Sequence, residues 1–444
     1  MKIKSRRFTI LLSMGFLLVL FGFIGKNFND YSLNNNASSN LDKNPTSTLK
    51  MSVINWTMTT EVVSTESTND SYWPAIVTDS ARNIHVVWQD DTDYDGSGTD
   101  KDIFYKLRNA TTDVWATTEV VSTESMGNSL YPLIAVDGAG NIHVVWPDDT
   151  DYDGSGTDRD IFYKLRNATT GVWTTTEVVS TESIGNSNEP TISSDGAGNI
   201  HVAWKDITNY DGSGTDMDIF YKLRNSTTDA WTTTEVVSTE SMGNSWFPTI
   251  AVDGAGNIHL AWDDYTNYGS SGTDLDIFYK FKNSTMGTWM TTEVVSTEST
   301  KLSNVAKIAA DSAGNIHVVW WDDTDYGGSG TDRDIFYKLR NATTGVWTTT
   351  EVVSTESTGT SWNPSIVSDG VEHIHVVWDD LTNYGGSGTD LDIFYKSKDV
   401  TTGAWTTTEV VSTESTAKSN VPKIAADGTG NIHVVWWDYT DYGG

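Results

Sequence analysis

The sequence contains no cysteine, which excludes disulfides, thiolate metal ligands and a cysteine nucleophile. Cationic side chains are also scarce, because 28 Lys and Arg stand against 60 Asp and Glu, for a formal net charge of −32. A surface of this charge repels phosphate groups, which argues against nucleic acid and anionic membrane surfaces as partners. It favours the binding of cations.

Helical periodicity is absent too, and a repeat of 58 residues takes its place. The run Asn-Ile-His-Val-Val-Trp returns with small changes, and its last residue falls at Trp88, Trp146, Trp204, Trp262, Trp320, Trp378 and Trp436. A second Trp keeps the same spacing apart from one extra residue in its first step. Self-similarity at a fixed period of this length is typical of repeat folds and propellers.

The second copy shows the expected strands of one repeat. Short β-branched and aromatic runs, separated by Gly, Asp and Thr-rich turns, predict strands over residues 132–137, 141–146, 160–166 and 172–180. Four short antiparallel strands per repeat are typical of one blade of a β-propeller. A solenoid of β-hairpins is the alternative.

The order of the copies predicts how the ring closes. The first strand pair occurs seven times, and the fourth strand also occurs seven times, but its first copy at residues 56–64 precedes every other strand. We therefore expect an all-β fold, a closed seven-bladed β-propeller in which residues 56–64 pair beside residues 431–436. The sequence stops at residues 441–444 inside a loop, so the last blade is incomplete and lacks its third strand.

The N-terminus predicts export. Residues 1–7 are basic and residues 8–25 form an apolar run, which is typical of a secretory signal or an uncleaved membrane anchor. Residues 26–50 are rich in Asn and Ser and are expected to be a flexible linker. The predicted organisation is a signal peptide or anchor at 1–25, the linker at 26–50 and the propeller at 51–444, outside the cell or on its surface, with membrane contact only through the N-terminal segment.

The repeat resembles those of sialidase-like propellers that carry Asp boxes. The carrying pattern is Pro-x-Ile-Ala-x-Asp-Gly-x-Gly-Asn-Ile-His-Val-Val-Trp, followed by Asp-Ile-Phe-Tyr-Lys and a turn that ends in Trp. The Asp box reads Ser-x-Asp-x-Gly-x-x-Trp, whereas this turn reads Asn167-Ala-Thr-Thr-Gly-Val-Trp173 and has lost the Ser and the Asp. The resemblance therefore implies a degenerate relative with the propeller fold.

The resemblance also implies what a sialidase would need: a Tyr nucleophile with a carboxylate partner, an acidic residue and a cluster of Arg that grips the sugar carboxylate. The Arg residues do not supply that cluster. Of the seven Arg after residue 50, four occupy one repeated position, and the others are isolated at Arg82, Arg159 and Arg333. We therefore predict no catalytic residues and no enzymatic activity. The one His that each copy repeats in mid-strand is expected to be structural.

The loop after the second strand predicts calcium binding in the first two copies. Asp91, Asp93, Asp95 and Asp102 have the spacing of a calcium loop, with Gly96 at its sharp turn. The equivalent residues of copy two are Asp149, Asp151, Asp153 and Asp160. A solvated loop held by Asx turns is the alternative. Glycosylation is expected in the next turn, at Asn109, Asn167, Asn225, Asn283 and Asn341.

Positions at which the copies differ indicate where function resides, because uniform positions maintain packing. Five of the 19 Trp lie outside the repeating positions: Trp73, Trp246, Trp321, Trp362 and Trp437. With Tyr131 they are expected on one face of the ring beside the acidic loops, as a platform for a glycan or a cell-surface protein. Aromatic side chains that fill gaps between loops are the alternative. A degenerate glycoside hydrolase and a structural adhesion or envelope repeat are the competing functions.

Overall fold

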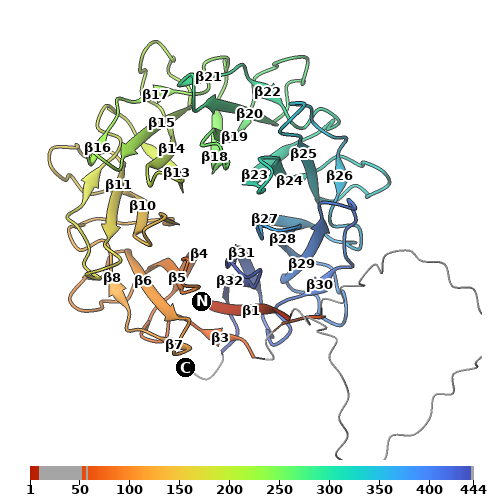
Figure 1. Cartoon of the computed structure of the whole chain (residues 1–444), viewed down its shortest axis with the longest axis horizontal. Coiled ribbons are helices and arrows are strands. Elements are labelled where there is room, and N and C mark those ends of the chain that lie inside the picture. The colour runs from red at the N-terminus through yellow and green to blue at the C-terminus, as the bar shows by residue number, and fades with distance from the viewer. Residues whose placement is uncertain (10–52, 57–58, 442–444) are drawn as a thin grey trace, which may run out of the picture.

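The computed structural model describes residues 1–9, 53–56 and 59–441. These residues form seven antiparallel sheets around one axis, with no helix among them (Figure 1). The first strand of blade 1 packs against the first strand of blade 7, which closes the ring. The predicted seven-bladed β-propeller is confirmed, and a solenoid is excluded.

The first three blades follow the expected strand order from the centre outward. Blade 1 contains β4 (Ser71–Thr78), β5 (Ile84–Asp90), β6 (Asp102–Asn109), β7 (Val114–Trp115) and β8 (Glu119–Val120). Blade 2 contains β9 (Leu133–Val136), β10 (Ile142–Asp148), β11 (Asp160–Arg166) and β12 (Glu177–Val178). Blade 3 contains β13 (Ser187–Ser194), β14 (Ile200–Asp206), β15 (Asp218–Asn225), β16 (Ala230–Trp231) and β17 (Glu235–Val236).

The next three blades repeat this order. Blade 4 contains β18 (Ser245–Val252), β19 (Ile258–Asp264), β20 (Asp276–Asn283), β21 (Thr288–Trp289) and β22 (Glu293–Val294). Blade 5 contains β23 (Ser303–Ala310), β24 (Ile316–Asp322), β25 (Asp334–Arg340) and β26 (Glu351–Val352). Blade 6 contains β27 (Ser361–Ser368), β28 (His373–Asp380), β29 (Asp392–Asp399) and β30 (Glu409–Val410).

Apolar side chains on both faces of the second strand form the core between neighbouring blades. In blade 2, Val144 and Trp146 pack in one cluster with Val87 and Tyr105 of blade 1. Val145, on the other face of the same strand, packs in the cluster shared with blade 3. Burial on both faces explains why this strand is a nearly continuous apolar run instead of an alternating one.

The repeated His and Trp inside this core contact polar partners. In blade 2, His143 Nδ1 lies 2.7 Å from the Tyr163 hydroxyl, and Nε2 lies 3.3 Å from the Asp137 carboxylate. The buried Trp146 indole donates to Asp148 at 2.8 Å. Equivalent contacts recur in the other blades. The repeated His therefore has the structural role that its spacing predicts, because buried polar groups require partners.

Charged side chains link each blade to the next. Lys164 of blade 2 is 1% exposed, and its Nζ donates to Val121 O at 2.8 Å, to Thr123 at 2.6 Å and to Glu124. Glu119 of blade 1 accepts hydrogen bonds from blade 2 as well, from Arg166 and from the Trp173 indole. Both carboxylates therefore link neighbouring blades.

The fourth strand is shorter than the sequence predicts. Over residues 172–180 only Glu177–Val178 forms a strand, with an isolated bridge at Trp173. The hydroxyl of Thr174 accepts the Leu165 N–H at 3.1 Å, and thus competes with the backbone ladder. The preceding turn is an Asx turn, because Asn167 Oδ1 accepts the N–H groups of Thr169 and Thr170. Glycosylation of these Asn residues stays a prediction.

The N-terminus of the chain completes the seventh blade. The last repeat supplies β31 (Ser419–Ala426) and β32 (Ile432–Asp438), and β1 (Lys2–Thr9) pairs with β32 where other blades have their third strand (Figure 1). Next to β1 lie β2 (Val53–Trp56) and β3 (Glu61–Val62). The expected pairing of residues 56–64 beside residues 431–436 is therefore wrong, because β1 separates them, and the ring includes residues before 51.

Candidate functional site

The residues that differ between copies lie at one end of the ring, where the first strand of each blade begins and the second strand ends. Two cross-strand pairs show the arrangement, Trp246–Asp263 and Trp362–Asp379. The equivalent pairs in blades 5 and 7 are Asn304–Trp321 and Asn420–Trp437. Because these pairs have the same register in every sheet, they lie at the same end, which we call the variable end.

The backbone is strained at the variable end. One residue before the Pro or Ala of each inner strand has a positive φ of 42–55°: Trp73, Tyr131, Glu189, Phe247, Val305, Asn363 and Val421. This region is unfavourable for bulky and β-branched residues. The preceding blade holds four of these residues in place. Asp263 accepts the Val305 N–H at 2.8 Å and Asp379 accepts the Val421 N–H at 3.1 Å. Gln89 and Glu189 accept the N–H groups of Tyr131 and Phe247 in the same way. Because it recurs in all seven blades, this strain belongs to the repeated fold.

Aromatic side chains cover blades 7, 1 and 2 at this end. The rings of Trp73 and Tyr131 lie 5.0 Å apart, edge to face, and the two residues are 37% and 41% exposed. The ring of Trp437 lies 5.2 Å from that of Tyr72. These four residues form a partly exposed aromatic surface across three blades.

The other predicted aromatic residues form two separate groups. Trp246 packs against Tyr265 with a centroid distance of 5.3 Å. The Arg333 guanidinium lies 4.1 Å from the ring centroid of Trp321 and 6.0 Å from that of Trp362. Trp321 is only 7% exposed, so it fills a gap between loops and can contact a ligand only if Arg333 moves.

Charged residues lie at the variable end of blades 3 to 7, either after the repeated Trp of the second strand or on the inner strand. Lys205 donates to Glu189 at 2.6 Å, and the Glu189 carboxylate also accepts the Phe247 N–H of blade 4. Lys307 and Lys423 follow the strained residue of their inner strands by two places. Each of these two lysines interacts electrostatically with a carboxylate of an earlier blade, Lys307 with Asp263 and Lys423 with Asp379.

Burial shifts the pKa values of this charged group. It raises the pKa of Asp379 to about 6 and also raises that of Asp263. It lowers the pKa of Lys423 to about 7, with the positive charge of Lys307 as the second cause. In the part of the chain that the structure describes, Asp379 Oδ1 is buried and has no hydrogen-bond partner. Its other oxygen, Oδ2, accepts hydrogen bonds from the Asn363 side chain and the Val421 N–H.

Sequence reasoning singled out the aromatic residues and missed these charged residues. The signal was available, because Lys205, Asp263 and Asp379 occupy the same repeat position as Trp321 and Trp437. What the sequence lacks is the ring geometry, which brings charges from five blades to the variable end.

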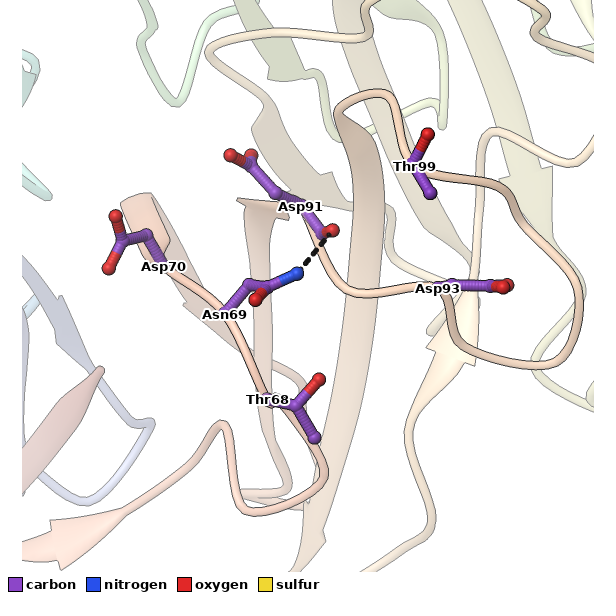
Figure 2. Close-up of a pocket in the computed structure, with 6 residues that line it drawn as sticks. All are labelled: Thr68, Asn69, Asp70, Asp91, Asp93 and Thr99. Atoms are coloured by element: carbon purple, nitrogen blue, oxygen red, sulfur yellow. Dashed lines mark hydrogen bonds between the residues drawn. The ribbon is translucent and has the colours of Figure 1, made fainter.

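The acidic loops do not gather their carboxylates. Figure 2 shows the side chains of Asp91 and Asp93 pointing away from each other, around an open pocket of about 700 Å³ beside Asp70. Asp102 is buried instead, where it accepts the Ser122 hydroxyl at 2.7 Å. Within residues 1–9, 53–56 and 59–441, no three Asp, Glu or His side chains are arranged to hold a metal ion.

Local turn chemistry explains the spacing of these Asp residues. Asp95 and Asp153 have φ values of 55° and 53°, and Gly269 takes the equivalent position at 61°. Asp and Gly are among the residues that tolerate this conformation, which accounts for their exchange between copies. Asp93 Oδ1 accepts the Gly98 N–H at 3.4 Å. Calcium binding stays a prediction.

A second pocket, of about 320 Å³, lies between blades 5 and 6 beside the turns that join first and second strands. Copy six departs from the repeat there, with His373 in place of the usual Asn. His373 Nδ1 lies 3.2 Å from the Asp369 carboxylate, which raises the pKa of His373. The predicted binding residues all lie at the variable end, so this pocket is separate from them.

Several predictions concern residues outside the structural description. The apolar run 8–25 falls on described residues only at positions 8 and 9, and the linker 26–50 lies outside them altogether. Among the described residues, no helix has the length and apolar character needed to cross a membrane.

Comparisons with known proteins give distant structural matches and no match in sequence. No protein-family model matches the chain, which leaves the Asp-box resemblance without support from sequence, and no curated protein matches it. The chain is similar in fold to the intramolecular trans-sialidase from Ruminococcus gnavus, with 11% identity over 84% of this chain and 91% of that one and a TM-score of 0.43. A polysaccharide lyase is 10% identical over 82% of this chain and 90% of that one, with a TM-score of 0.49. The alpha-L-arabinanase of Penicillium chrysogenum is 11% identical over 75% of this chain and 94% of that one, with a TM-score of 0.46. At this level the similarity is one of fold alone, and the chain is a seven-bladed β-propeller.

Proposed function

We propose that this protein is an exported, surface-displayed propeller that binds a glycan through its variable end and does not cleave it. The observation that carries the proposal is the grouping of non-repeated aromatic residues at one end of an otherwise uniform ring, with Trp73 and Tyr131 partly exposed. Aromatic rings beside hydrogen-bonding carboxylates suit sugars, which present apolar faces and hydroxyl edges together.

A protein ligand is the second candidate. The same aromatic residues would serve as hot spots in a protein interface, and the excess of carboxylates would favour a basic partner. A glycan agrees better with the combination of exposed aromatic rings and charged groups at the variable end, because a sugar presents apolar faces together with hydroxyl groups.

Hydrolysis is the third candidate, and one observation favours it. Asp263 and Asp379 are buried carboxyl groups with raised pKa values near the axis, and paired carboxyl groups with altered pKa values are the machinery of glycosidases. Both carboxylates already accept backbone N–H groups from the next blade, as Gln89 does from Tyr131 in blade 1. A structural role therefore accounts for them, and we assign them no catalytic step.

The test is a glycan array probed with the purified protein and with matched variants. Trp246→Ala and Trp362→Ala should weaken binding about tenfold or more, as expected for the loss of about 1–3 kcal/mol of stacking. Val172→Ala, at an exposed position of an outer turn, should leave binding unchanged. Absence of binding to any glycan, together with capture of a basic protein partner, would favour the second candidate. Release of sugar from a bound glycan would contradict the non-catalytic assignment.

A further inference from the structure

The third strand of blade 7 differs from that of every other blade. Blades 1 to 6 carry the run Ile-Phe-Tyr-Lys on this strand, at residues 161–164 in blade 2. In blade 7 the third strand is β1, from the opposite end of the chain, which brings Met-Lys-Ile-Lys to the same register (Figure 1). The blade that closes the ring is therefore built on a substitute for the repeated strand.

β1 reproduces the main-chain contacts and the lysine of the repeated strand. The Val63 N–H donates to Met1 O at 3.0 Å, as the equivalent N–H does in blade 2 at 2.7 Å. Lys4 Nζ donates to Glu414, which follows the last strand of blade 6, at 3.0 Å. This is the contact between blades that the repeated lysine makes elsewhere. The position thus selects an extended strand with a lysine at this place.

The residue before the aromatic pair of contacts is poorly matched in β1, because Lys2 stands where the repeat has Phe. Its cross-strand partner is the fully buried Trp436. In blade 2 the equivalent rings of Phe162 and Trp146 lie 6.1 Å apart, edge to face, and this contact recurs in blades 1 and 3 to 6. Lys2 is only 6% exposed, and burial lowers the pKa of its amine. Burial of a charged group is unfavourable, so this position favours Phe over Lys.

The next position is mismatched as well, because Ile3 stands where the repeat has Tyr. In blade 2 the Tyr163 hydroxyl lies 2.7 Å from His143 Nδ1, and the same contact recurs in blades 1 and 3 to 6. Isoleucine has no hydroxyl to offer His433, the equivalent histidine. His433 Nε2 also lies 3.9 Å from the Asp427 carboxylate, against 3.2–3.4 Å for this distance in blades 1 to 5. A tyrosine would supply the contact that the other blades have.

We propose that blade 7 is a strand-acceptor site, at which β1 exchanges for an extended segment of another protein that carries the pattern Ile-Phe-Tyr-Lys. In strand addition, main-chain hydrogen bonds give affinity and the pockets for side chains give specificity. The incoming Phe would lie opposite Trp436, the Tyr beside His433 and the Lys at Glu414. Because β1 belongs to the same chain, it competes at high effective concentration, and the incoming segment must fit better than β1 does.

A second copy of this chain is a poor donor of the segment. Each of its six strands with this pattern lies between two other strands of its own blade, so donation would require a blade to open. The partner is therefore a chain in which the pattern is not already part of a sheet. This site is separate from the variable end, and the proposal does not depend on glycan binding there.

The test uses the whole protein and a fluorescent peptide with the sequence of residues 158–166, Asp-Arg-Asp-Ile-Phe-Tyr-Lys-Leu-Arg. The control peptide has Lys and Ile in place of Phe and Tyr, as β1 has, and is the more basic of the two. Fluorescence anisotropy at equilibrium should give a Kd at least about tenfold lower for the repeat peptide, because its aromatic residues fit the buried positions. Equal binding of the two peptides, tighter binding of the basic control, or no binding of either would overturn the proposal.

Protein variants locate the peptide at blade 7. Lys2→Phe combined with Ile3→Tyr gives β1 the aromatic residues of the repeat, so the melting temperature should rise and the repeat peptide should no longer bind. A raised melting temperature with unchanged peptide binding would place the peptide elsewhere, and the proposal would fail.

A second comparison does not rely on that variant. Replacing Tyr by Phe in the repeat peptide should weaken binding to the unaltered protein by about threefold or more, the effect of one hydrogen bond. The same replacement should have no effect on binding to His433→Phe, which lacks the partner of the hydroxyl group. An equal loss with both proteins would contradict the predicted register. Dimers of the protein alone that the repeat peptide dissociates would assign the site to a second copy and overturn the choice of partner.

Discussion

Two regions of each blade, the contact with its neighbours and the variable end, keep the same backbone in every copy. The sequence is nearly constant in the first region and changes from copy to copy in the second. Between blades, Trp146, Lys164 and His143 recur with the same partners in nearly every copy. At the variable end, the residue after the repeated Trp is Gln89 in blade 1 and Pro147 in blade 2, and it is Lys, Asp or Trp elsewhere. A side chain that must fit two neighbouring blades has few substitutes, whereas one that faces the axis is free to take up a function.

The largest expected effect is the contrast between two Trp. Trp146→Ala removes a fully buried ring and its hydrogen bond to Asp148, and should cost about 3–5 kcal/mol of unfolding free energy. Trp246→Ala should cost about 1 kcal/mol or less, because its ring lies at the surface of the variable end. Urea unfolding of both variants measures the contrast. Similar losses would show that the variable end belongs to the structural core.

The next effect concerns the buried lysines between blades. Lys164→Met leaves Val121 O and Glu124 without their donor. It should lower the free energy of unfolding by about 2–4 kcal/mol, because the remaining carboxylate loses its partner. Lys205→Met is the matched control at the variable end, where its partner Glu189 is 25% exposed, and it should cost about 1 kcal/mol. An equal cost for the two variants would contradict the comparison.

The closing blade makes this test sharper. Lys4 holds the place of Lys164 there, with bonds to Thr413 at 2.9 Å and to Glu414 at 3.0 Å. If β1 stays in the ring, Lys4→Met should destabilise the protein about as much as Lys164→Met does. No change in the exported protein would show that β1 leaves with the signal segment. Mass spectrometry of the exported N-terminus distinguishes the two outcomes.

The sequence predicted most of the fold because the period of 58 residues marks every blade, and turn chemistry marks the strand ends. It could not predict β1, since Lys2 and Ile3 stand where the other third strands have Phe and Tyr, and only Lys4 keeps the repeated residue. The aromatic half of the site was visible as an excess of Trp. The charged half was not, because Asp379 of blade 6 meets the Val421 N–H of blade 7 only when the blades pack against each other.

A smaller effect per residue is expected from pH. Burial raises the pKa of one Asp in each of six blades to about 6: Asp102, Asp160, Asp218, Asp276, Asp334 and Asp392. The unfolded value is near 3.8, so the folded state binds more protons, and stability should fall as pH rises from about 4 to about 6. Melting temperatures across this range measure the slope, which Asp160→Asn should reduce.

Below that range the slope should reverse. Burial acts to raise the pKa of Asp137, but hydrogen bonds from His143 and Asn141 outweigh it and lower that pKa to about 2. The pKa values of Asp253 and Asp311 are lowered in the same way. Groups of this kind lose their stabilising effect as pH falls from about 4 through about 2. A maximum of stability near pH 4 is therefore expected. A melting temperature that rises steadily from pH 4 to pH 7 would contradict the role given to the six buried Asp.

The smallest expected effect is that of calcium, although the loops that suggested it lie beside the variable end. Tight calcium sites gather six to eight oxygen atoms around the ion, whereas Asp93 already accepts the Gly98 N–H and Asp102 is buried against Ser122. A chelator should therefore change the unfolding free energy by about 1 kcal/mol or less, the value for ligand concentrations within a few-fold of Kd. Calorimetry with and without chelator measures this, with magnesium as the control ion. A drop of many degrees, removed by Asp93→Ala with Asp151→Ala, would show that the loops rearrange to collect the ion, and that the variable end is assembled by calcium instead of by the blades alone.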